Sequence, residues 1–356
     1  MNPTAITHAP FAFVPSISMP FISVIVPCRN EAAYLGPCLD SILASEYPPD
    51  RMEVLVADGM SEDGTRELTR RYASRDARVH PIDNPRRITP TALNCALERA
   101  RGEVIVRLDA HATVAPSYLA GAVKWLESSG ADNVGGVMHT VTRDRGMFAE
   151  PIRLVLTSPF GVGNSRFRTG ADKPAWVDTV FGGCWRREVF GRIGKFNERL
   201  ERSQDIEFNL RLRRAGGTVL LAPDMECRYY VRATLGYFLR HNWSNGVWAV
   251  LPFAYAQGAP VRWRHLIPLA FVCSLGAAML ASALASPTLP WLPALILFPY
   301  TAVNLTVSIA SAWKLRRPSL ALLLPIAFAS LHFPYGLGSL WGTLRLIRAK
   351  LRSNNS

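Results

Sequence analysis

The chain has 356 residues, 49% of them hydrophobic, and its 26 prolines and 25 glycines are dispersed, which excludes fibrous and low-complexity proteins. Its 40 Lys and Arg against 27 Asp and Glu give a formal charge of +13, which favours an anionic partner: nucleic acid, an anionic membrane surface or a phosphorylated small molecule. The six cysteines form no CxxC pair and no zinc-like spacing, a pattern typical of reduced thiols.

The first residues, 1–20, form an N-terminal extension without the basic start of a secretory signal, so we expect no cleaved signal peptide. Residues 21–27 are a short apolar, β-branched run and predict a strand that is buried on both faces. Apolar residues at positions 35, 39, 42 and 43 then predict a helix, and residues 52–56 predict a second strand.

The same unit repeats along the chain. We expect a helix over 63–75, a strand over 79–83, a helix over 89–100 and a strand over 103–108. This alternation predicts an α/β fold with a mostly parallel sheet and flanking helices. Because ligands bind at the carboxyl ends of such strands, Asp58 and Asp109, each at the end of a strand, are candidate site residues.

The last 130 residues differ in composition, since no Asp or Glu follows Glu226. Residues 265–284, 290–312 and 319–344 carry no charge, and each run is long enough to cross a hydrocarbon core of about 30 Å as a helix. We therefore expect a large domain over 21–250, an interfacial linker over 251–264, a membrane region over 265–348 with two or three crossings, and a tail over 349–356.

The basic residues bear on the topology of this region. The link 285–289 has none, whereas Lys314, Arg316, Arg317 and the stretch 345–352 are basic. A cytosolic large domain places the first link outside and the second inside, in line with the positive-inside rule. Three complete crossings would leave the basic tail outside. Either the third segment is re-entrant or interfacial, or the tail is an exception, and the sequence leaves both open.

Each candidate carboxylate also has a structural interpretation. Asp58 precedes a glycine, and the two residues could simply form a turn after the strand. Asp109 and His111, two apart on an extended chain, would point the same way and could bind one divalent ion that bridges a diphosphate. Asp205 opens an amphipathic helix, where acidic residues are common because of the helix dipole.

Taken together, these motifs resemble glycosyltransferase family 2 over roughly residues 20–250. The resemblance rests on residues 23–31, Asp58-Gly59 with Ser61 and residues 63–65, Asp109-Ala110-His111, and Gln204-Asp205 before Arg211-Leu212. The sequence is similar in particular to membrane-anchored exopolysaccharide transferases of the succinoglycan type, through the Asp-Ala-His motif and residues 332–338.

The resemblance implies a GT-A fold, a nucleotide-diphosphate sugar donor, expected to be a UDP-sugar, and a divalent metal, Mg²⁺ or Mn²⁺. By analogy, Pro27, Glu31 and Asp58 would line the nucleoside pocket, and Asp109 would hold the metal and the diphosphate. His111 would be the second member of the metal pair, in place of the commoner aspartate, which favours softer ions.

The resemblance also assigns an acceptor side. Asp205 matches the catalytic base, which would take the proton of an acceptor hydroxyl and invert the anomeric centre. The family's usual Glu before it is Gln204 here, which removes a like charge that would raise the pKa of the base. The acceptor-side residues implied are Gly183, Cys184, Arg187 and Trp248, and Trp248 could instead lie at the bilayer interface.

We therefore expect an inverting enzyme that adds one sugar to a lipid-linked saccharide, carried on polyprenyl diphosphate, in exopolysaccharide or cell-surface glycan synthesis. It would be a multi-pass protein of the cytoplasmic membrane, with its catalytic domain in the cytosol, and would contact membrane lipids but no nucleic acid. Gln257 and Arg262-Trp263 lack the Gln-x-x-Arg-Trp spacing of processive synthases. The alternatives are a processive synthase, a polyprenyl-phosphate glycosyl synthase, or a non-catalytic scaffold or transporter with a nucleotide-binding domain.

Overall fold

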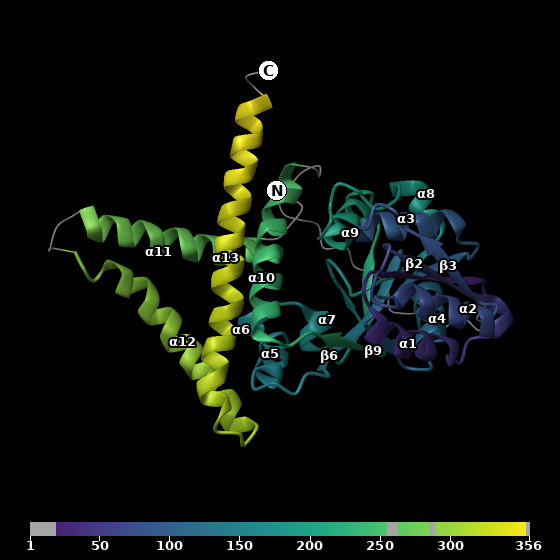
Figure 1. Ribbon diagram of the computed structural model, residues 1–356, viewed down its shortest axis with the longest axis horizontal. Helices are drawn as coiled ribbons and strands as arrows, with labels where there is room; N and C mark the ends of the chain where they lie inside the picture. The colour runs from purple at the N-terminus through teal and green to yellow at the C-terminus, as the bar shows by residue number, and fades with distance from the viewer. Residues whose placement is uncertain (1–18, 255–262, 285–288, 354–356) are drawn as a thin grey trace. The chain divides into compact units, whose positions relative to one another are not determined.

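The computed structural model describes residues 19–254, 263–284 and 289–353 (Figure 1). Most of the expected extension 1–20, much of the linker 251–264 with Gln257 and Arg262, most of the link 285–289 and the end of the tail lie outside these residues. The chain divides into two compact units. The sheet unit comprises three segments: the chain up to Val137, Ala171–Lys195 and Arg211–Cys227. The second unit comprises Met138–Gly170, Phe196–Leu210 and the chain from Arg228 onward.

The first half of the sheet unit confirms the expected alternation of strands and helices. Its elements are β1 (Ile22–Cys28), α1 (Ala32–Leu43), a 3₁₀ turn at Pro49–Arg51, β2 (Met52–Asp58), α2 (Thr65–Arg75), β3 (Val79–Asp83), α3 (Thr89–Arg99) and β4 (Val104–Arg107). The strands pair in parallel in the order β3-β2-β1-β4. All seven residues of β2 are buried, as a strand covered by helices on both faces requires.

The second half makes the sheet mixed. It contains β5 (Ala112–Val114), α4 (Tyr118–Ser129), β6 (Asn133–Thr142), β7 (Ala175–Trp176), β8 (Cys184–Arg186), α8 (Glu188–Ile193), α9 (Gln204–Arg214) and β9 (Val219–Val231). Three of these elements, β6, α9 and β9, belong in part to the second unit, which includes the first seven residues of α9. The sheet continues from β4 in the order β8-β6-β9-β5, and β7 pairs with β9. Strand β8 is antiparallel to both β4 and β6, and β7 is antiparallel to β9, so this half adds antiparallel pairs to the parallel order of the first four strands.

The second unit is mainly helical. It contains α5 (Ala149–Val155), α6 (Pro159–Val162), α7 (Arg166–Thr169), α10 (Leu235–Val250), 3₁₀ turns at Leu251–Ala254 and Trp263–Leu266, α11 (Ile267–Leu284), α12 (Leu292–Lys314) and α13 (Leu320–Ser353). Three of its helical stretches are long and apolar enough to cross a membrane: Trp263–Leu284, Leu292–Lys314 and Leu320–Arg348. Helix α13 is continuous through Pro325 and Pro334, so the prolines and glycines of this segment do not interrupt it.

The glycines of the second unit allow close helix packing. A Cβ on Gly246 of α10 would lie 2.0 Å from the Tyr335 carbonyl oxygen, and one on Gly338 of α13 would lie 2.2 Å from that of Trp243. The Ser339 hydroxyl donates to the Gly246 carbonyl at 3.0 Å. Small residues therefore let the backbones of α10 and α13 touch, as small residues do in tightly packed helix pairs.

Candidate active site

The polar residues predicted for the donor side gather where β1, β2 and β4 end. Parallel register places Cys28 at the end of β1 beside Asp58 at the end of β2, and Asp58 beside Asp83 at the end of β3. Two loops cross this edge. The Asn30 backbone N–H donates to the Ser61 hydroxyl at 2.8 Å, and the Glu31 N–H donates to the Thr65 hydroxyl at 2.9 Å.

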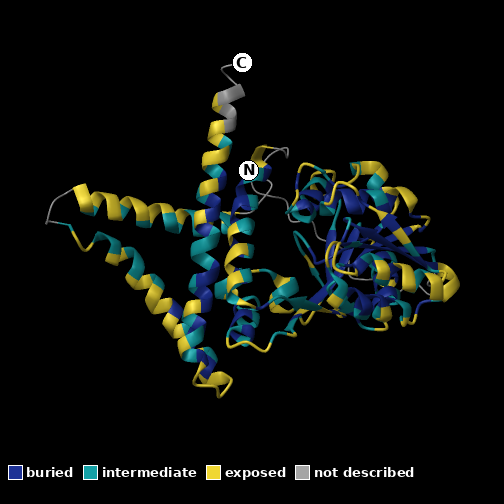
Figure 2. Ribbon diagram, in the orientation of Figure 1, coloured by how far each residue is buried: buried dark blue, intermediate teal, exposed yellow. Residues whose placement is uncertain are grey.

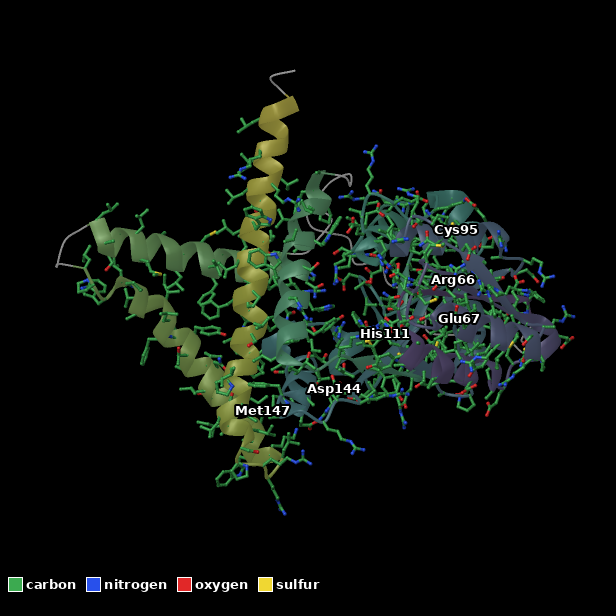
Figure 3. The ribbon with its side chains drawn as sticks, in the orientation of Figure 1. Arg66, Glu67, Cys95, His111, Asp144 and Met147 are labelled. Carbon is green, nitrogen blue, oxygen red and sulfur yellow. The ribbon has the colours of Figure 1, made fainter. Side chains whose placement is uncertain are left out.

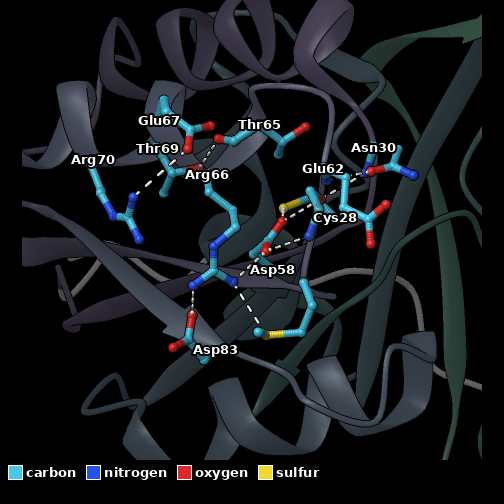
Figure 4. Close-up of polar contacts among 12 residues, drawn as sticks. Cys28, Asn30, Asp58, Glu62, Thr65, Arg66, Glu67, Thr69, Arg70 and Asp83 are labelled. Carbon is cyan, nitrogen blue, oxygen red and sulfur yellow. Dashed lines mark hydrogen bonds and ion pairs between the residues drawn. The ribbon is translucent and has the colours of Figure 1, made fainter.

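The Asp58 carboxylate is buried and already held by its neighbours (Figure 4). It accepts hydrogen bonds from the Ser61 backbone N–H at 2.9 Å and the Ser61 hydroxyl at 2.5 Å. Arg66 on α2 donates to it at 3.1 Å and to Asp83 at 2.9 Å, so one guanidinium joins two strand ends. Asp58 therefore stabilises the turn that follows β2, and a contact with a nucleoside would be a second function of the same carboxylate.

Cys28 lies beside this carboxylate, but it is not a reactive thiol. Burial, together with the charges of Asp58 and Glu31, raises the pKa of the Cys28 thiol far above its ordinary value. The protonated side chain contacts the Asp58 carboxylate oxygen at 3.8 Å. Because the thiol stays protonated, covalent catalysis through Cys28 is not expected.

Asp109 lies in a turn and not in the extended segment predicted from the sequence. The Ala112 N–H donates to the Asp109 carbonyl at 2.9 Å, which closes a turn between β4 and β5. The Asp109 side chain accepts from the Arg107 guanidinium at 3.0 and 3.2 Å. Burial raises the pKa of Asp109, but the charges of Arg107 and then His111 outweigh it and hold the pKa below its ordinary value.

His111 pairs with a residue from another loop. Its Nδ1 lies 3.3 Å from Oε1 of Glu31, and its ring meets the edge of Tyr34 with centroids 6.5 Å apart. Figure 3 labels His111 and Arg66 on the sheet unit. The structure thus brings Glu31 and His111 into contact, although the sequence assigned them to different tasks.

The donor atoms of these residues are of the kinds that bind divalent metals. Carboxylate oxygens of Asp109 and Glu31 and a nitrogen of His111 are suitable ligands for Mn²⁺, and the oxygens for Mg²⁺. Among the described residues, no group of three His, Cys, Asp or Glu is placed to bind a metal by itself. The set therefore fits a metal that takes most of its ligands from substrate phosphates and water, as Mg²⁺ commonly does in phosphate-binding sites.

Two residues predicted for the acceptor side belong to the sheet core. Gly183 has φ +115°, and a Cβ there would lie 2.3 Å from the Trp185 ring, so glycine is required by packing. Cys184 is fully buried in β8, and its N–H donates to the Asn133 side chain at 3.1 Å. Its side chain has no exposed surface for an acceptor, so we leave Cys184 out of the site.

Arg187 also takes a structural position. Its Nε donates to the Gly102 carbonyl at 2.7 Å, and its Nη2 donates to that of Ala100. Because β8 runs antiparallel to β4, Arg187 lies beyond the amino end of β4, whereas Asp109 follows the carboxyl end. Arg187 therefore anchors the loop after α3, and we also leave it out of the site.

Asp205 lies in the first turn of α9, in the second unit, and is partly exposed. Within the described parts of the chain, no hydrogen bond or ion pair reaches its carboxylate. Gln204 before it is buried, and its Oε1 accepts no hydrogen bond from the described residues. Unlike Asp58 and Asp109, Asp205 is therefore a carboxylate open to an incoming hydroxyl.

The loop before Asp205 is fixed to α10. Arg202 donates to the Asn245 side chain at 2.9 Å, and the Ser203 hydroxyl donates to the Trp248 carbonyl at 3.3 Å. Ser203 has φ +60°, a left-handed conformation that a side chain adopts only when its surroundings hold it. Trp248, predicted on the acceptor side, thus contacts the loop that carries the candidate base.

Arg66 and Arg107 are site residues that the sequence analysis did not identify. Each neutralises a predicted carboxylate, Arg66 from eight residues downstream of Asp58 and Arg107 from two residues upstream of Asp109. The sequence does mark Arg107, because it is the one charged residue in the otherwise apolar strand β4. Such a residue is buried only with a partner, and Asp109 was within reach.

Comparison with known proteins agrees with this geometry. Residues 23–194 match the family described as glycosyl transferase family 2. The succinoglycan biosynthesis protein ExoA of Rhizobium meliloti is 32% identical over 269 residues, which cover 69% of this chain and 80% of the relative. A Methanococcus voltae relative, named as a glucuronosyltransferase acting on a dolichyl N-acetylglucosaminyl phosphate, is 25% identical over 92% of this chain and 98% of its own.

Solved structures show the same fold. The mannosyltransferase PcManGT of Pyrobaculum calidifontis, solved with GDP-Man and Mn²⁺, superposes with a TM-score of 0.57 and 24% identity, over 94% of this chain and 91% of that chain. The mixed sheet with its flanking helices is thus the GT-A fold that the sequence motifs implied. The chain belongs to glycosyl transferase family 2 and is a glycosyltransferase.

Proposed function

We propose that this enzyme transfers a single sugar from a nucleotide-diphosphate sugar to a lipid-linked saccharide, with inversion, in exopolysaccharide or cell-surface glycan synthesis at the cytoplasmic membrane. The observation that carries the proposal is the carboxylate of Asp205, which has no partner among the described residues and belongs to the same compact unit as the three apolar helices. A base that acts on the acceptor is thus part of the unit that would meet a membrane-borne acceptor.

The acceptor class has independent support. The Methanococcus voltae relative is named for a dolichyl-linked sugar phosphate, and the Rhizobium meliloti relative for succinoglycan biosynthesis. A saccharide carried on polyprenyl diphosphate has an anionic head, and the second unit has no acidic residue beyond Glu226 to repel it. The indole of Trp248 offers a surface on which a sugar ring can stack.

The donor would bind at the carboxyl edge of the parallel strands. Pro27, Glu31 and Asp58 would line the nucleoside pocket, with Asp58 held in place by Ser61 and Arg66. We expect a UDP-sugar, and the GDP-Man of the Pyrobaculum calidifontis structure makes GDP-sugars the first comparison. Asp109 and His111, with Glu31 adjacent, would hold a divalent metal. Such an ion would neutralise the charge of the diphosphate as it leaves.

The chain's own chemistry is a proton transfer. The Asp205 carboxylate would accept the proton of the acceptor hydroxyl as that oxygen forms its bond to the anomeric carbon. The bond from that carbon to the nucleotide oxygen breaks at the same time, and the diphosphate leaves with the electron pair. Attack on the face opposite the leaving group inverts the anomeric configuration.

The test uses the full chain, purified in detergent, with UDP-, GDP- and dTDP-sugars, Mg²⁺ or Mn²⁺, and a membrane lipid extract as the acceptor source. We expect one donor to turn over only with metal, and Asp205→Asn to lower kcat by about 10²-fold or more, in the range of general base catalysis, while donor binding persists. Glu201→Gln, an exposed carboxylate four residues earlier, is the control and should keep its activity. Equal activity of both variants would remove Asp205 from the mechanism.

A further inference from the structure

Helix α13 has two unlike faces from Leu320 to Gly342. Apolar side chains exposed at helical spacing form one stripe, which we call the apolar stripe: Leu322, Ile326, Leu337, Trp341, Leu344, Ile347 and Leu351. The stripe extends over about 44 Å at the rise of an α-helix, and between Ile326 and Leu337 the residues on its face, Ala329 and Phe333, are only partly exposed. The opposite face is buried against other elements of the second unit, as the change of colour across α13 in Figure 2 shows.

The buried face contacts segments that carry charged and amide side chains. Near the start of α13, Leu320, Leu324 and Phe328 pack with α5, whose Glu150 and Arg153 form an ion pair at 2.7 Å. His332 then contacts the Phe160 carbonyl of α6 at 3.1 Å.

Helix α10 covers the next part of α13. Its Gly246 lies against Tyr335, and its Val247 against Gly342. Arg240 of α10 is exposed, and Asn245 is hydrogen-bonded to Arg202.

These contacts leave no segment of α13 free to cross a bilayer. From residue 320 to residue 342 the helix spans about 33 Å at 1.5 Å per residue, which already equals the thickness of the hydrocarbon core. A crossing would take Glu150 and Arg153 of α5 and Arg240 of α10 into hydrocarbon, where one Arg or Asp at the centre costs about 2.5–3.5 kcal/mol on insertion scales. Eleven residues of α13 follow residue 342, too few to cross the hydrocarbon core as part of this helix.

Helices α11 and α12 have different surroundings. Only the first turns of α11 meet α13, where Pro268 and Val272 lie against Gly336. The remainder runs away from α13 (Figure 1), and no part of the apolar window of α11 is buried in the protein, against 11% for α12 and 39% for α13. Helix α12 keeps one face on α13, where Asn304 donates to the Pro325 carbonyl at 3.1 Å and Tyr300 lies 3.1 Å from His332. The other faces of α12 and most of α11 are apolar and exposed, and such surfaces are suited to lipid.

Basic residues stand at both ends of α13. Lys314, Arg316 and Arg317 precede it, and Arg345 and Arg348 lie in its last turns, all of them exposed. A helix that crossed the membrane would separate these two clusters by the bilayer, whereas a helix parallel to the surface keeps both on one side. The positive-inside rule favours the second arrangement.

We propose that only α11 and α12 cross the membrane and that α13 lies flat on its cytoplasmic surface, with the apolar stripe in the bilayer and the two basic clusters on anionic lipid headgroups. This arrangement removes the conflict between three crossings and a basic tail. Each basic residue near an anionic surface adds about 1 kcal/mol of attraction, so the two clusters act together with the stripe. The proposal rests on the membrane attachment that forms part of the proposed function.

The first test determines on which side of the membrane the link between α11 and α12 and the tail of the chain lie. Ser286→Cys and Asn355→Cys, in the otherwise unchanged full chain, are treated with a membrane-impermeant maleimide in intact cells and after lysis, with the unsubstituted chain as the blank. We expect Ser286→Cys to react in intact cells and Asn355→Cys only after lysis. Reaction of Asn355→Cys in intact cells, or failure of Ser286→Cys to react there, would overturn the proposal.

The second test measures depth. Nitroxide labels at Leu322→Cys, Leu337→Cys and Leu351→Cys, with the accessible Cys95 and Cys273 changed to Ser, are examined in vesicles of phosphatidylcholine and phosphatidylglycerol. We expect one shallow depth for all three labels and a deeper position for Met279→Cys in α11. A Leu337→Cys label deeper than both others would show that α13 crosses.

A paired variant tests the lipid partner. Arg345→Gln with Arg348→Gln should move the Leu351→Cys label toward water in vesicles with phosphatidylglycerol, with no change in neutral vesicles. Arg71→Gln with Arg75→Gln, exposed on α2, is the matched control and should leave the label in place. An equal label position in both vesicle types, for the unsubstituted chain and the variant, would exclude anionic headgroups as the partner. None of these readouts depends on sugar transfer, so they can fail or succeed separately from the proposed activity.

Discussion

Arg66 holds two carboxylates at the donor edge of the sheet. Its guanidinium lies 3.1 Å from Asp58 and 2.9 Å from Asp83, and the Asp58 side chain is only 6% exposed. Without Arg66, the buried charge of Asp58 would keep its bonds to Ser61 and the weak contact with the Cys28 thiol, but no cationic partner. A buried charge that loses a partner is destabilised, and the strand end that carries it loosens.

Arg66→Gln should therefore lower the free energy of unfolding by about 1–3 kcal/mol and raise KM for the donor more than it lowers kcat. Arg70→Gln is the control on the same helix, because its pair with Glu67 is 3.9 Å long and more than 60% exposed on both sides. Exposed pairs of this kind contribute about 0–1 kcal/mol. Thermal unfolding and donor kinetics of the full chain measure both effects, and equal losses in the two variants would contradict this role of Arg66.

Glu53 makes the stability of the sheet depend on pH. Its carboxylate accepts from the Ser23 hydroxyl at 2.6 Å and from the Arg101 backbone N–H at 2.7 Å. Burial raises the pKa of Glu53, but these hydrogen bonds and the Arg101 charge outweigh it and lower the pKa below its ordinary value. A lowered pKa in the folded state means that the contribution is complete above the unfolded pKa of about 4.3 and is lost as the pH falls through the folded value.

Glu53→Gln should thus lower the melting temperature at pH 7, with a loss of about 1–3 kcal/mol, and the gap from the unsubstituted chain should close below about pH 4. Glu98→Gln removes an exposed pair with Lys195 and should change the melting temperature little at any pH. Melting curves from pH 7 to pH 3 at constant ionic strength give the comparison. A gap that stayed constant with pH would mean that Glu53 contributes by packing and not by its charge.

At the scale of elements, α10 connects the loop of the candidate base to α13. Gly246 touches the backbone of α13, while Asn245 and Trp248, its neighbours in α10, bind the loop before Asp205. A methyl group on Gly246 must push the two helices apart, because the Tyr335 carbonyl lies 2.0 Å from where that Cβ would stand. The shift would reach the loop through α10.

Gly246→Ala should therefore destabilise the chain and lower kcat, with little change in donor KM. Overpacking of this kind costs about 1–3 kcal/mol. Gly276→Ala in α11, where no atom lies within 4 Å of the new methyl group, should be neutral or stabilising by about 1 kcal/mol, the difference in helix propensity. Loss of stability without loss of kcat in Gly246→Ala would show that α10 does not position the base.

Elements with a strong periodic pattern could be predicted from the sequence, and local turns could not. The strand Val79–Asp83 has the predicted bounds, and α3 ends one residue earlier than predicted. The segment from Asp109 to His111 was expected to be extended, but a backbone bond from Ala112 closes it into a turn that no hydrophobic pattern marks. Arg187 was assigned to the acceptor side from a motif, and a motif does not show which end of a neighbouring strand a residue meets. The antiparallel pairing of β8 with β4 decides that position.

For the whole molecule, composition identified a membrane region but not which segments cross. Hydropathy treats α11, α12 and α13 alike, because it counts side chains and does not record what packs against them. The packing of α10 on α13 is a tertiary feature that depends on Gly246, Gly338 and Gly342, and their spacing alone did not identify the partner helix. The division of the chain into two units, with Asp109 in one and Asp205 in the other, was likewise not visible in the motifs.

Because α11 and α12 are proposed to cross the membrane and α13 to lie on its surface, an arginine should have different effects in these helices. Val303→Arg puts a guanidinium into the middle of α12, at a cost of about 2.5–3.5 kcal/mol, and Met279→Arg puts one into α11 five residues before its end, at a smaller cost. Both should reduce the fraction that stays in the membrane after alkaline carbonate extraction. Leu337→Arg in the middle of α13 should leave that fraction unchanged, because an arginine at the interface can extend its head into the aqueous layer. All three positions are more than 40% exposed, so burial in the protein does not explain a difference between them. An equal decrease of the retained fraction in all three variants would mean that α13 lies in the hydrocarbon core like α11 and α12, and the flat orientation would then be wrong.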